Sequence, residues 1–204
     1  MKKMRLVFLL ICLGILCGYI SAEGAADAKQ FLESGDAYYN DGKYDMAIKE
    51  YGKALAIDEG LADAYYHRGL AYDKMESIDK AIQDYSKAIS LTPRHDDALI
   101  YHNRGLAYLK SGNYNEAIED YDNAIAINPK FTEAYHNRGI AYSRKGQYDK
   151  AIEDYNRALE IRPNYGGAYF SRGVAYVKKA EEDFRKVCAM GNKMACENLK
   201  QISE

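Results

Sequence analysis

The pentapeptide YHNRG stands at residues 101–105 and again at residues 135–139, between the variants YYHRG at 65–69 and YFSRG at 169–173. The glycines that end these four copies, together with Gly35, follow one another at intervals of 34, 36, 34 and 34 residues. A fixed period of this length is typical of proteins in which copies of one unit stack on one another. The sequence therefore predicts a repeat architecture.

Each period predicts two amphipathic helices and a tight turn. In the third unit, residues 98–111 carry apolar side chains at helical spacing, Gly112 and Asn113 interrupt the pattern, and residues 114–127 resume it until Pro129. No segment shows the alternating polarity of a strand. The fold class is therefore all-α, with units at residues 28–61, 62–95, 98–131 and 132–165.

These units resemble the tetratricopeptide repeat family at its characteristic positions. The third unit carries the family's aromatic, glycine and alanine slots and its closing proline as Tyr101, Gly105, Tyr108, Ala117, Tyr121, Ala124 and Pro129. The second and fourth units match at all of these slots, and the first has Glu59 where the proline would stand. The resemblance covers roughly residues 28–165 and implies a right-handed α-solenoid of helix-turn-helix repeats.

Packing explains the tyrosines. The chain has 20 Tyr and no Trp, and most of the Tyr fall on repeated slots. A glycine is needed where two helices approach closely, and a tyrosine fills the space beside it with its hydroxyl at the edge. We therefore interpret these tyrosines as core residues without a function of their own.

A charged pair is predicted by two residues that change together. In three units an Arg precedes the glycine and an Asp follows 16 residues after that Arg; the pairs are Arg68 and Asp84, Arg104 and Asp120, and Arg138 and Asp154. The first unit has Ser34 and Glu50 at these two places. Because both residues differ there, we predict an Arg–Asp bridge between the two helices of each of the other three units. The alternative is that these charges are solvated.

The C-terminal region departs from the pattern. Only three residues separate Tyr176 from Ala180, so about five residues of the usual turn are missing from a degenerate fifth unit at 166–190. Its two helices either fuse or form a tighter turn, and a capping helix is expected at 192–203.

Cys188 and Cys196 are eight residues apart, which is about 12 Å along a straight helix, too far for a disulfide. A bond between them requires a bend, which Gly191 and Asn192 can supply. The segment also resembles disulfide-bridged helical-repeat relatives of the family, and this resemblance implies a Cys188–Cys196 bond. Reduced thiols, buried as small apolar residues, are the alternative.

The first 22 residues are interpreted as a secretory signal peptide. Three cationic residues precede an apolar run at 6–20 that is shorter than a membrane span, and residues 20–22 offer a small-residue cleavage site. We therefore expect a mature chain at 23–204 that is exported, periplasmic or extracellular. The alternatives are an uncleaved anchor, the one case in which the chain would bind a membrane, and a lipoprotein at Cys12 or Cys17.

Composition and motifs argue against several function classes. With 48% apolar residues, 28% charged residues and a net charge of -2, nothing indicates disorder or nucleic-acid binding. His67, His102 and His136 are spaced along a ridge and do not converge on a metal, and no zinc-protease, nucleophile-elbow or phosphate-loop motif occurs. We expect no enzyme activity, no cofactor, no metal site and no small-molecule substrate.

Two functions are in contention. The resemblance implies an interaction scaffold that binds a peptide or partner protein in a concave groove lined by the first helices. The alternative is a self-assembling structural envelope subunit that stacks through the ends of the solenoid. A monomer in solution favours the scaffold, and a concentration-dependent ladder of assemblies favours the structural subunit.

The groove is predicted from the slots around each Arg-Gly pair. The resemblance places in it Tyr66, Leu70, His102, Asn103, Leu106, His136, Asn137, Ile140, Phe170 and Val174. This set forms an apolar, aromatic strip with amide donors and little charge. The alternatives are that the Leu and Ile row packs against the next helix and that the His and Asn row is a solvated ridge. The carboxylate clamp of chaperone-binding members is incomplete, because its basic slots hold Leu32, Tyr66, His102, Glu133 or Gly167.

Overall fold

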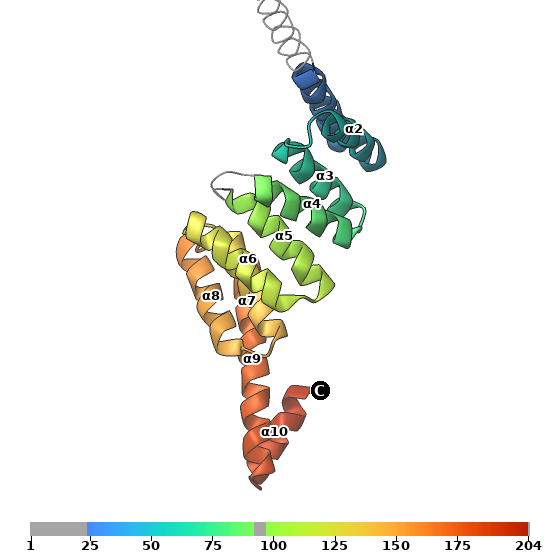
Figure 1. The fold of residues 1–204 in the computed structure, drawn as a ribbon. Helices are drawn as coiled ribbons and strands as arrows, with labels where there is room; N and C mark the ends of the chain where they lie inside the picture. Colours follow the sequence, from blue (N-terminus) through green and yellow to red (C-terminus); the bar gives the residue numbers. More distant parts are fainter. Residues whose placement is uncertain (1–23, 92–96, 204) are drawn as a thin grey trace, which may run out of the picture. The chain divides into compact units, whose positions relative to one another are not determined.

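The computed structural model describes residues 24–91 and 97–203, and the signal peptide expected at residues 1–22 lies outside this range. The chain divides into two compact units at residues 1–95 and 96–204. Every regular element in the described residues is a helix, and within each unit consecutive helices are joined by short turns and pack against one another (Figure 1). The all-α solenoid fold class is confirmed.

The unit at 1–95 contains a helical segment over residues 24–40, followed by α2 (Tyr44–Ile57), α3 (Ala62–Lys74) and α4 (Ile78–Leu91). The unit at 96–204 contains α5 (Ala98–Ser111), α6 (Tyr114–Ile127), α7 (Thr132–Arg144), α8 (Tyr148–Ile161), α9 (Gly166–Ala189) and α10 (Lys193–Ser203).

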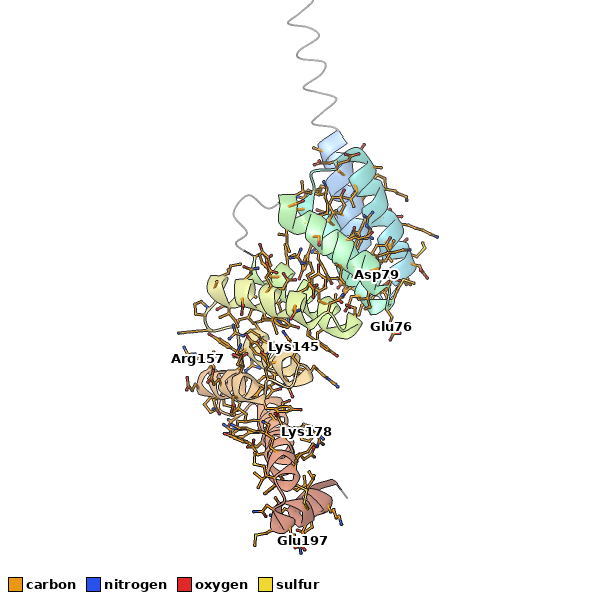
Figure 2. All side chains as sticks on the ribbon, turned by 60° about the horizontal axis from the view of Figure 1, so that its bottom comes forward. Glu76, Asp79, Lys145, Arg157, Lys178 and Glu197 are labelled. Carbon is orange, nitrogen blue, oxygen red and sulfur yellow. A yellow bond between two sulfur atoms is a disulfide. The ribbon has the colours of Figure 1, made fainter. Side chains whose placement is uncertain are left out.

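The turn inside each helix pair requires a left-handed residue. Gly42, Gly112 and Gly146 occupy this position with φ of 74°, 81° and 74°. The second repeat has Glu76 there with φ 57°, a conformation that costs a residue with a Cβ about 1 kcal/mol or more (Figure 2). The turn is therefore set by the helices on either side and not by the glycine alone.

The core of each complete repeat is a contact between a glycine on the first helix and a tyrosine on the second. The tyrosine side chains of these contacts are at most 1% exposed: Tyr51, Tyr85, Tyr121 and Tyr155. A Cβ at Gly139 would lie 2.6 Å from Cε1 of Tyr155, closer than carbon atoms approach in proteins. The packing role predicted for this glycine is confirmed, since no larger residue fits beneath the ring.

The Arg–Asp bridges are also confirmed. Nε and Nη2 of Arg104 donate to the two carboxylate oxygens of Asp120 at 2.8 and 2.7 Å, and Asp120 is only 2% exposed. The same two-bond geometry joins the other two predicted pairs, Arg68 with Asp84 and Arg138 with Asp154. The carboxylate is thus buried with its charge compensated and its oxygens hydrogen-bonded.

The two helices of the fifth repeat are fused into one. Residues 166–189 form the single helix α9, and α10 folds back beside its C-terminal half (Figure 1). Gly191 takes φ 91° in the turn between them, and Cys188 is bonded to Cys196 with the two Cα atoms 4.8 Å apart. The predicted bend and the predicted disulfide are both present.

Candidate binding groove

A hollow lies on the unit at 96–204, between the first helices of two consecutive repeats. Its volume is about 460 Å³, and its walls come from α7, α8 and α9: Ile140, Ser143, Arg144, Tyr148, Tyr155, Phe170, Ser171, Val174 and Lys178. The buried ring of Tyr155 forms part of the floor, and burial raises the pKa of its hydroxyl to about 12. The hollow therefore combines apolar walls with two cationic residues.

A second hollow occupies the equivalent place in the unit at 1–95. Its volume is about 310 Å³, and it is lined by Asp36, Tyr39, Asn40, Tyr51, His67 and Leu70. Counting by the repeat period, Leu70 corresponds to Val174 and Asp36 to Ile140. The same position between two first helices is therefore hollow in both units, with different chemistry in each.

Polar contacts organise the second hollow. The hydroxyl of Tyr51 donates to Oδ1 of Asp36 at 2.8 Å, and Nδ1 of His67 lies 2.6 Å from the same oxygen. Burial, reinforced by this hydrogen bond, raises the pKa of Tyr51. Asp36 thus joins the helix at 24–40 to α2 and α3 and leaves a polar wall where the other hollow has Ile140.

Four of the ten predicted groove residues line these hollows: Leu70, Ile140, Phe170 and Val174. Phe170 is 76% exposed, an unusual state for a large aromatic side chain. Tyr66 is half-buried, with its ring centroid 6.0 Å from that of Tyr85. Asn103, Leu106 and Asn137 are also half-buried.

The expectation that His102 faces the groove is wrong. Its side chain is 8% exposed, because Phe131, which immediately precedes α7, covers it with ring centroids 4.7 Å apart. The ring also packs 5.8 Å from Tyr121, and Nδ1 has no hydrogen-bond partner among the described residues. Burial lowers the pKa of His102 to about 4, so the ring is neutral at pH 7.

His136 is engaged in contacts within the fold. Its Nε2 lies 3.0 Å from Oγ of Ser171, and its Nδ1 lies 3.2 Å from the hydroxyl of Tyr165. Burial is the largest influence on its pKa and lowers it. This histidine therefore connects α7 to α9 and the residue before it, and it is neither the solvated ridge residue nor the free groove donor that the sequence allowed.

Two cationic residues of the first hollow were not predicted. Arg144 and Lys178 each lie one helical turn after a predicted apolar residue, Ile140 and Val174. Nζ of Lys178, labelled in Figure 2, is 3.0 Å from a carboxylate oxygen of Glu181. Arg144 is exposed. The i to i+4 spacing on a helix face was the sequence signal that could have found them.

Other classes of site were sought in the same part of the chain. Within residues 24–91 and 97–203 no group of three or more His, Cys, Asp or Glu side chains is placed to hold a metal ion. Over the same residues, none of the helices combines the length and the apolar character that crossing a membrane would need.

Comparisons with known proteins agree with the repeat units. The family described as Tetratricopeptide repeat matches residues 62–95 and 132–165, and the one described as TPR repeat matches residues 35–76 and 107–146. Tetratricopeptide repeat protein 14 of Mus musculus is 34% identical over 76 residues, which are 37% of this chain and 10% of that protein. The chain thus spans a small part of this curated relative.

Solved structures extend the likeness to most of the chain. The crystal structure of MamA protein is 28% identical with a TM-score of 0.72, covering 86% of this chain and 90% of that one. The first TPR of Spaghetti (RPAP3), bound to the HSP90 peptide SRMEEVD, is 30% identical with a TM-score of 0.54, covering 56% and 90%. With the repeat contacts described above, these matches show that the chain belongs to the tetratricopeptide repeat family.

Proposed function

We propose that this protein is an interaction scaffold that binds a peptide or an exposed segment of a partner protein in the hollows between its first helices. The observation that carries the proposal is the recurrence of a hollow at the same repeat position in both units. The peptide-bound Spaghetti structure, a relative of the same fold, supports this mode of use. Recognition of a short segment by a groove of stacked helices requires no chemistry beyond packing and hydrogen bonding.

The hollow on α7, α8 and α9 favours a ligand with an apolar anchor and an acidic group. Ile140, Phe170 and Val174 offer apolar surface for the anchor, and Phe170 is exposed enough to close over it. Arg144 offers a guanidinium to a carboxylate at the edge of the hollow. The ligand is therefore less purely apolar than the sequence alone predicts.

Selection from a display library of random peptides on the immobilised chain tests this proposal. We expect enriched peptides to share an aliphatic or aromatic residue near an Asp or Glu. Phe170→Ser and Arg144→Glu should each weaken binding of a selected peptide by about tenfold or more, because they remove an anchor contact and a charge pair.

Leu99→Ser is the matched control, since Leu99 is an exposed apolar residue on α5 that lines neither hollow. Equal thermal melting of all variants separates binding from folding. Peptides that bind the Phe170 and Arg144 variants as tightly as the parent would contradict a site in this hollow.

We further propose that the chain works outside the cytoplasm, as the leader-like residues 1–22 suggest. The Cys188–Cys196 bond supports this, because disulfides persist in oxidising compartments and are rare in the cytosol. Cell fractionation should find the protein outside the cytoplasm, and alkylation of the denatured protein from that fraction should find no free thiol at these two residues. Recovery of the chain in the cytosol with both thiols free would contradict export.

A further inference from the structure

Helix α9 contains both halves of a repeat without the turn that would let them meet. Its first half carries Gly173 at the glycine slot, and its second half carries Ala180, Asp183 and Phe184 in the order of Ala151, Asp154 and Tyr155 in α8. In one continuous helix, Gly173 and Phe184 are about 16 Å apart along the axis. The contact that closes every complete repeat is therefore impossible within one copy of α9.

The first half of α9 accordingly has an open face. Nothing lies within 4 Å of a Cβ at Gly173, whereas the equivalent glycines are covered by a tyrosine ring. Tyr169, Tyr176 and Val177, on the same face, are exposed. A hollow of about 590 Å³ lies over this face, lined by Tyr169, Phe170, Gly173, Val174, Val177, Lys178 and Glu181.

The two charged residues that would form the Arg–Asp bridge of the fifth repeat are also separated. Arg172 occupies the bridging slot, and its Nη1 donates to Oδ1 of Asn156 at 2.6 Å. In the described residues no carboxylate contacts its Nε and Nη2, the two atoms that hold Asp in the complete repeats. Asp183 has a side chain that is 63% exposed, with Nζ of Lys186 4.0 Å away. Arg172 and Asp183 therefore occupy the two slots of the bridge without contacting each other within one copy of α9.

The second half of α9 is covered on only one side. Helix α10 lies against the side of Glu181 and Cys188, where the side chain of Glu181 is 16% exposed and Cys188 is bonded to α10. On the other side, Val187 is 40% exposed and Asp183 faces solvent. These two residues correspond to Ala158 and Asp154 of α8, and Phe184, which corresponds to Tyr155, is half-buried.

We propose that two copies of this chain pair through α9, antiparallel about a two-fold axis between Lys178 and Lys179. The first half of each helix takes the second half of the other as its missing partner. Phe184 of the second copy seats over Gly173, and Asp183 of the second copy receives the Nε and Nη2 of Arg172. Each contact forms twice, as two-fold symmetry requires.

The register supports this pairing. In antiparallel helices, the residue numbers of facing pairs add up to nearly the same value. In the fourth repeat Tyr155 lies over Gly139, and Tyr142 packs on the cluster that contains Ala151. If Phe184 of the second copy lies over Gly173, then Ala180 of the second copy lies beside Tyr176. This pair corresponds to Ala151 and Tyr142 of the fourth repeat. One placement of the two helices therefore satisfies the packing and the charge slots together.

The chemistry also favours a second copy over an unrelated helix. Both members of each unmade contact are present on the same chain, and shortening the turn of a helical hairpin is a known cause of exchange between identical chains. The lysines at the centre already have partners within one copy, since Lys178 pairs with Glu181 and Lys179 with Asp149 of α8, so neither brings an unpaired charge to the shared face. A closed two-fold pair stops at two copies and is distinct from end-to-end stacking of solenoids.

Sedimentation of the whole chain, with its disulfide intact, tests the pairing. We expect the parent to be a dimer that dissociates on dilution. Arg172→Glu and Asp183→Arg should each weaken the dimer by about tenfold or more, because like charges then face each other at both contacts.

An equimolar mixture of the two variants should regain the parental affinity. In the mixed dimer, the glutamate introduced in one copy faces the arginine introduced in the other, and the second contact keeps its native pair of Arg172 and Asp183. Within one helix these positions cannot meet, so recovery on mixing reports a contact between copies.

Two further variants address the turn and the glycine slot. Insertion of residues 146–150, Gly-Gln-Tyr-Asp-Lys, between Lys179 and Ala180 restores the spacing of the fourth repeat and should give a monomer that completes the fifth repeat within one chain. Gly173→Ala should weaken the dimer, whereas Gly167→Ala, at a glycine of α9 that faces His136 and Tyr165 at ordinary contact distance, should not. A parent that stays monomeric at every concentration, or a dimer that none of these changes weakens, would overturn the proposal.

Discussion

At the residue scale, the Arg–Asp bridge fixes both partners in a buried place. Asp120 is 2% exposed and holds Arg104 through two hydrogen bonds. Asp120→Asn removes the charge but keeps the shape, so it leaves the guanidinium partly buried without a counter-ion. We expect a loss of about 2–4 kcal/mol in the free energy of unfolding, measured by urea denaturation. Glu119→Gln, at the neighbouring position, is the control and should change stability by less than about 0.5 kcal/mol.

His102 makes stability depend on pH. Its pKa is lowered by burial to about 4 in the folded chain, against 6.5 for an exposed histidine. The unfolded chain therefore binds a proton first as pH falls, and stability is lost progressively between pH 6.5 and pH 4, by up to about 3 kcal/mol. Burial lowers the pKa of His136 as well, so its effect has the same sign.

Urea denaturation of the parent and of His102→Phe across this pH range measures the effect. Phe is the matched choice because Phe170 occupies the equivalent slot of the fifth repeat. The variant should lose less stability than the parent between pH 6.5 and pH 4. Parallel curves for the two proteins would show that His102 is not buried as a neutral ring.

At the element scale, helix pairs and bridges were predictable because each depends on residues that recur with the period, whereas the disulfide was implied by the resemblance to disulfide-bridged helical-repeat proteins. The groove was only partly predictable. The slot of His102 and the slot of Phe170 are the same position in the repeat, but Phe131 covers the first, and Phe170 has no following repeat to cover it. Burial of that slot is decided by the next unit along the chain, which the pentapeptide itself does not encode.

The fate of the fifth repeat could not be settled from the sequence for a similar reason. A deletion of about five residues from a turn permits either a tight bend or a continuous helix, and Val177, Lys178 and Lys179 are all compatible with a helix. No glycine stands at the place where Gly112 and Gly146 end the earlier first helices. Because Glu76 makes the same turn in the second repeat, the missing glycine acts together with the missing turn residues to leave α9 continuous.

Helix α10 should depend on its covalent link. It has 11 residues, too few for a stable isolated helix, and it packs against α9 alone among the described helices. The Cys188–Cys196 bond closes a short loop, worth about 2.5 kcal/mol in the chain-entropy view. We expect reduction to speed amide hydrogen exchange throughout α10, measured by mass spectrometry, while α7 and α8 keep their protection.

The variant with Ala at both Cys188 and Cys196 should exchange like the reduced parent, with or without reductant. Slow exchange in α10 after reduction would mean that packing on α9 holds this helix without the bond.

At the scale of the whole molecule, the proposed pairing through α9 would bring two copies of each proposed binding hollow into one particle. A ligand protein that displays two recognition segments would then be held at both, with the second contact formed at the effective concentration set by the first. Such avidity depends on geometry and adds no new contact to either site.

The bridging arginines reach beyond their own repeat. Arg138 contacts Asp154 in the same repeat through two nitrogens and Asp122 in the preceding repeat through the third. Arg172 likewise contacts Asn156 in the repeat before it. Loss of one repeat would thus remove a partner from the arginine of the next, so adjacent repeats are coupled in unfolding. The array from α6 to α9 should consequently lose its structure as one cooperative block, with little fraying from one repeat to the next.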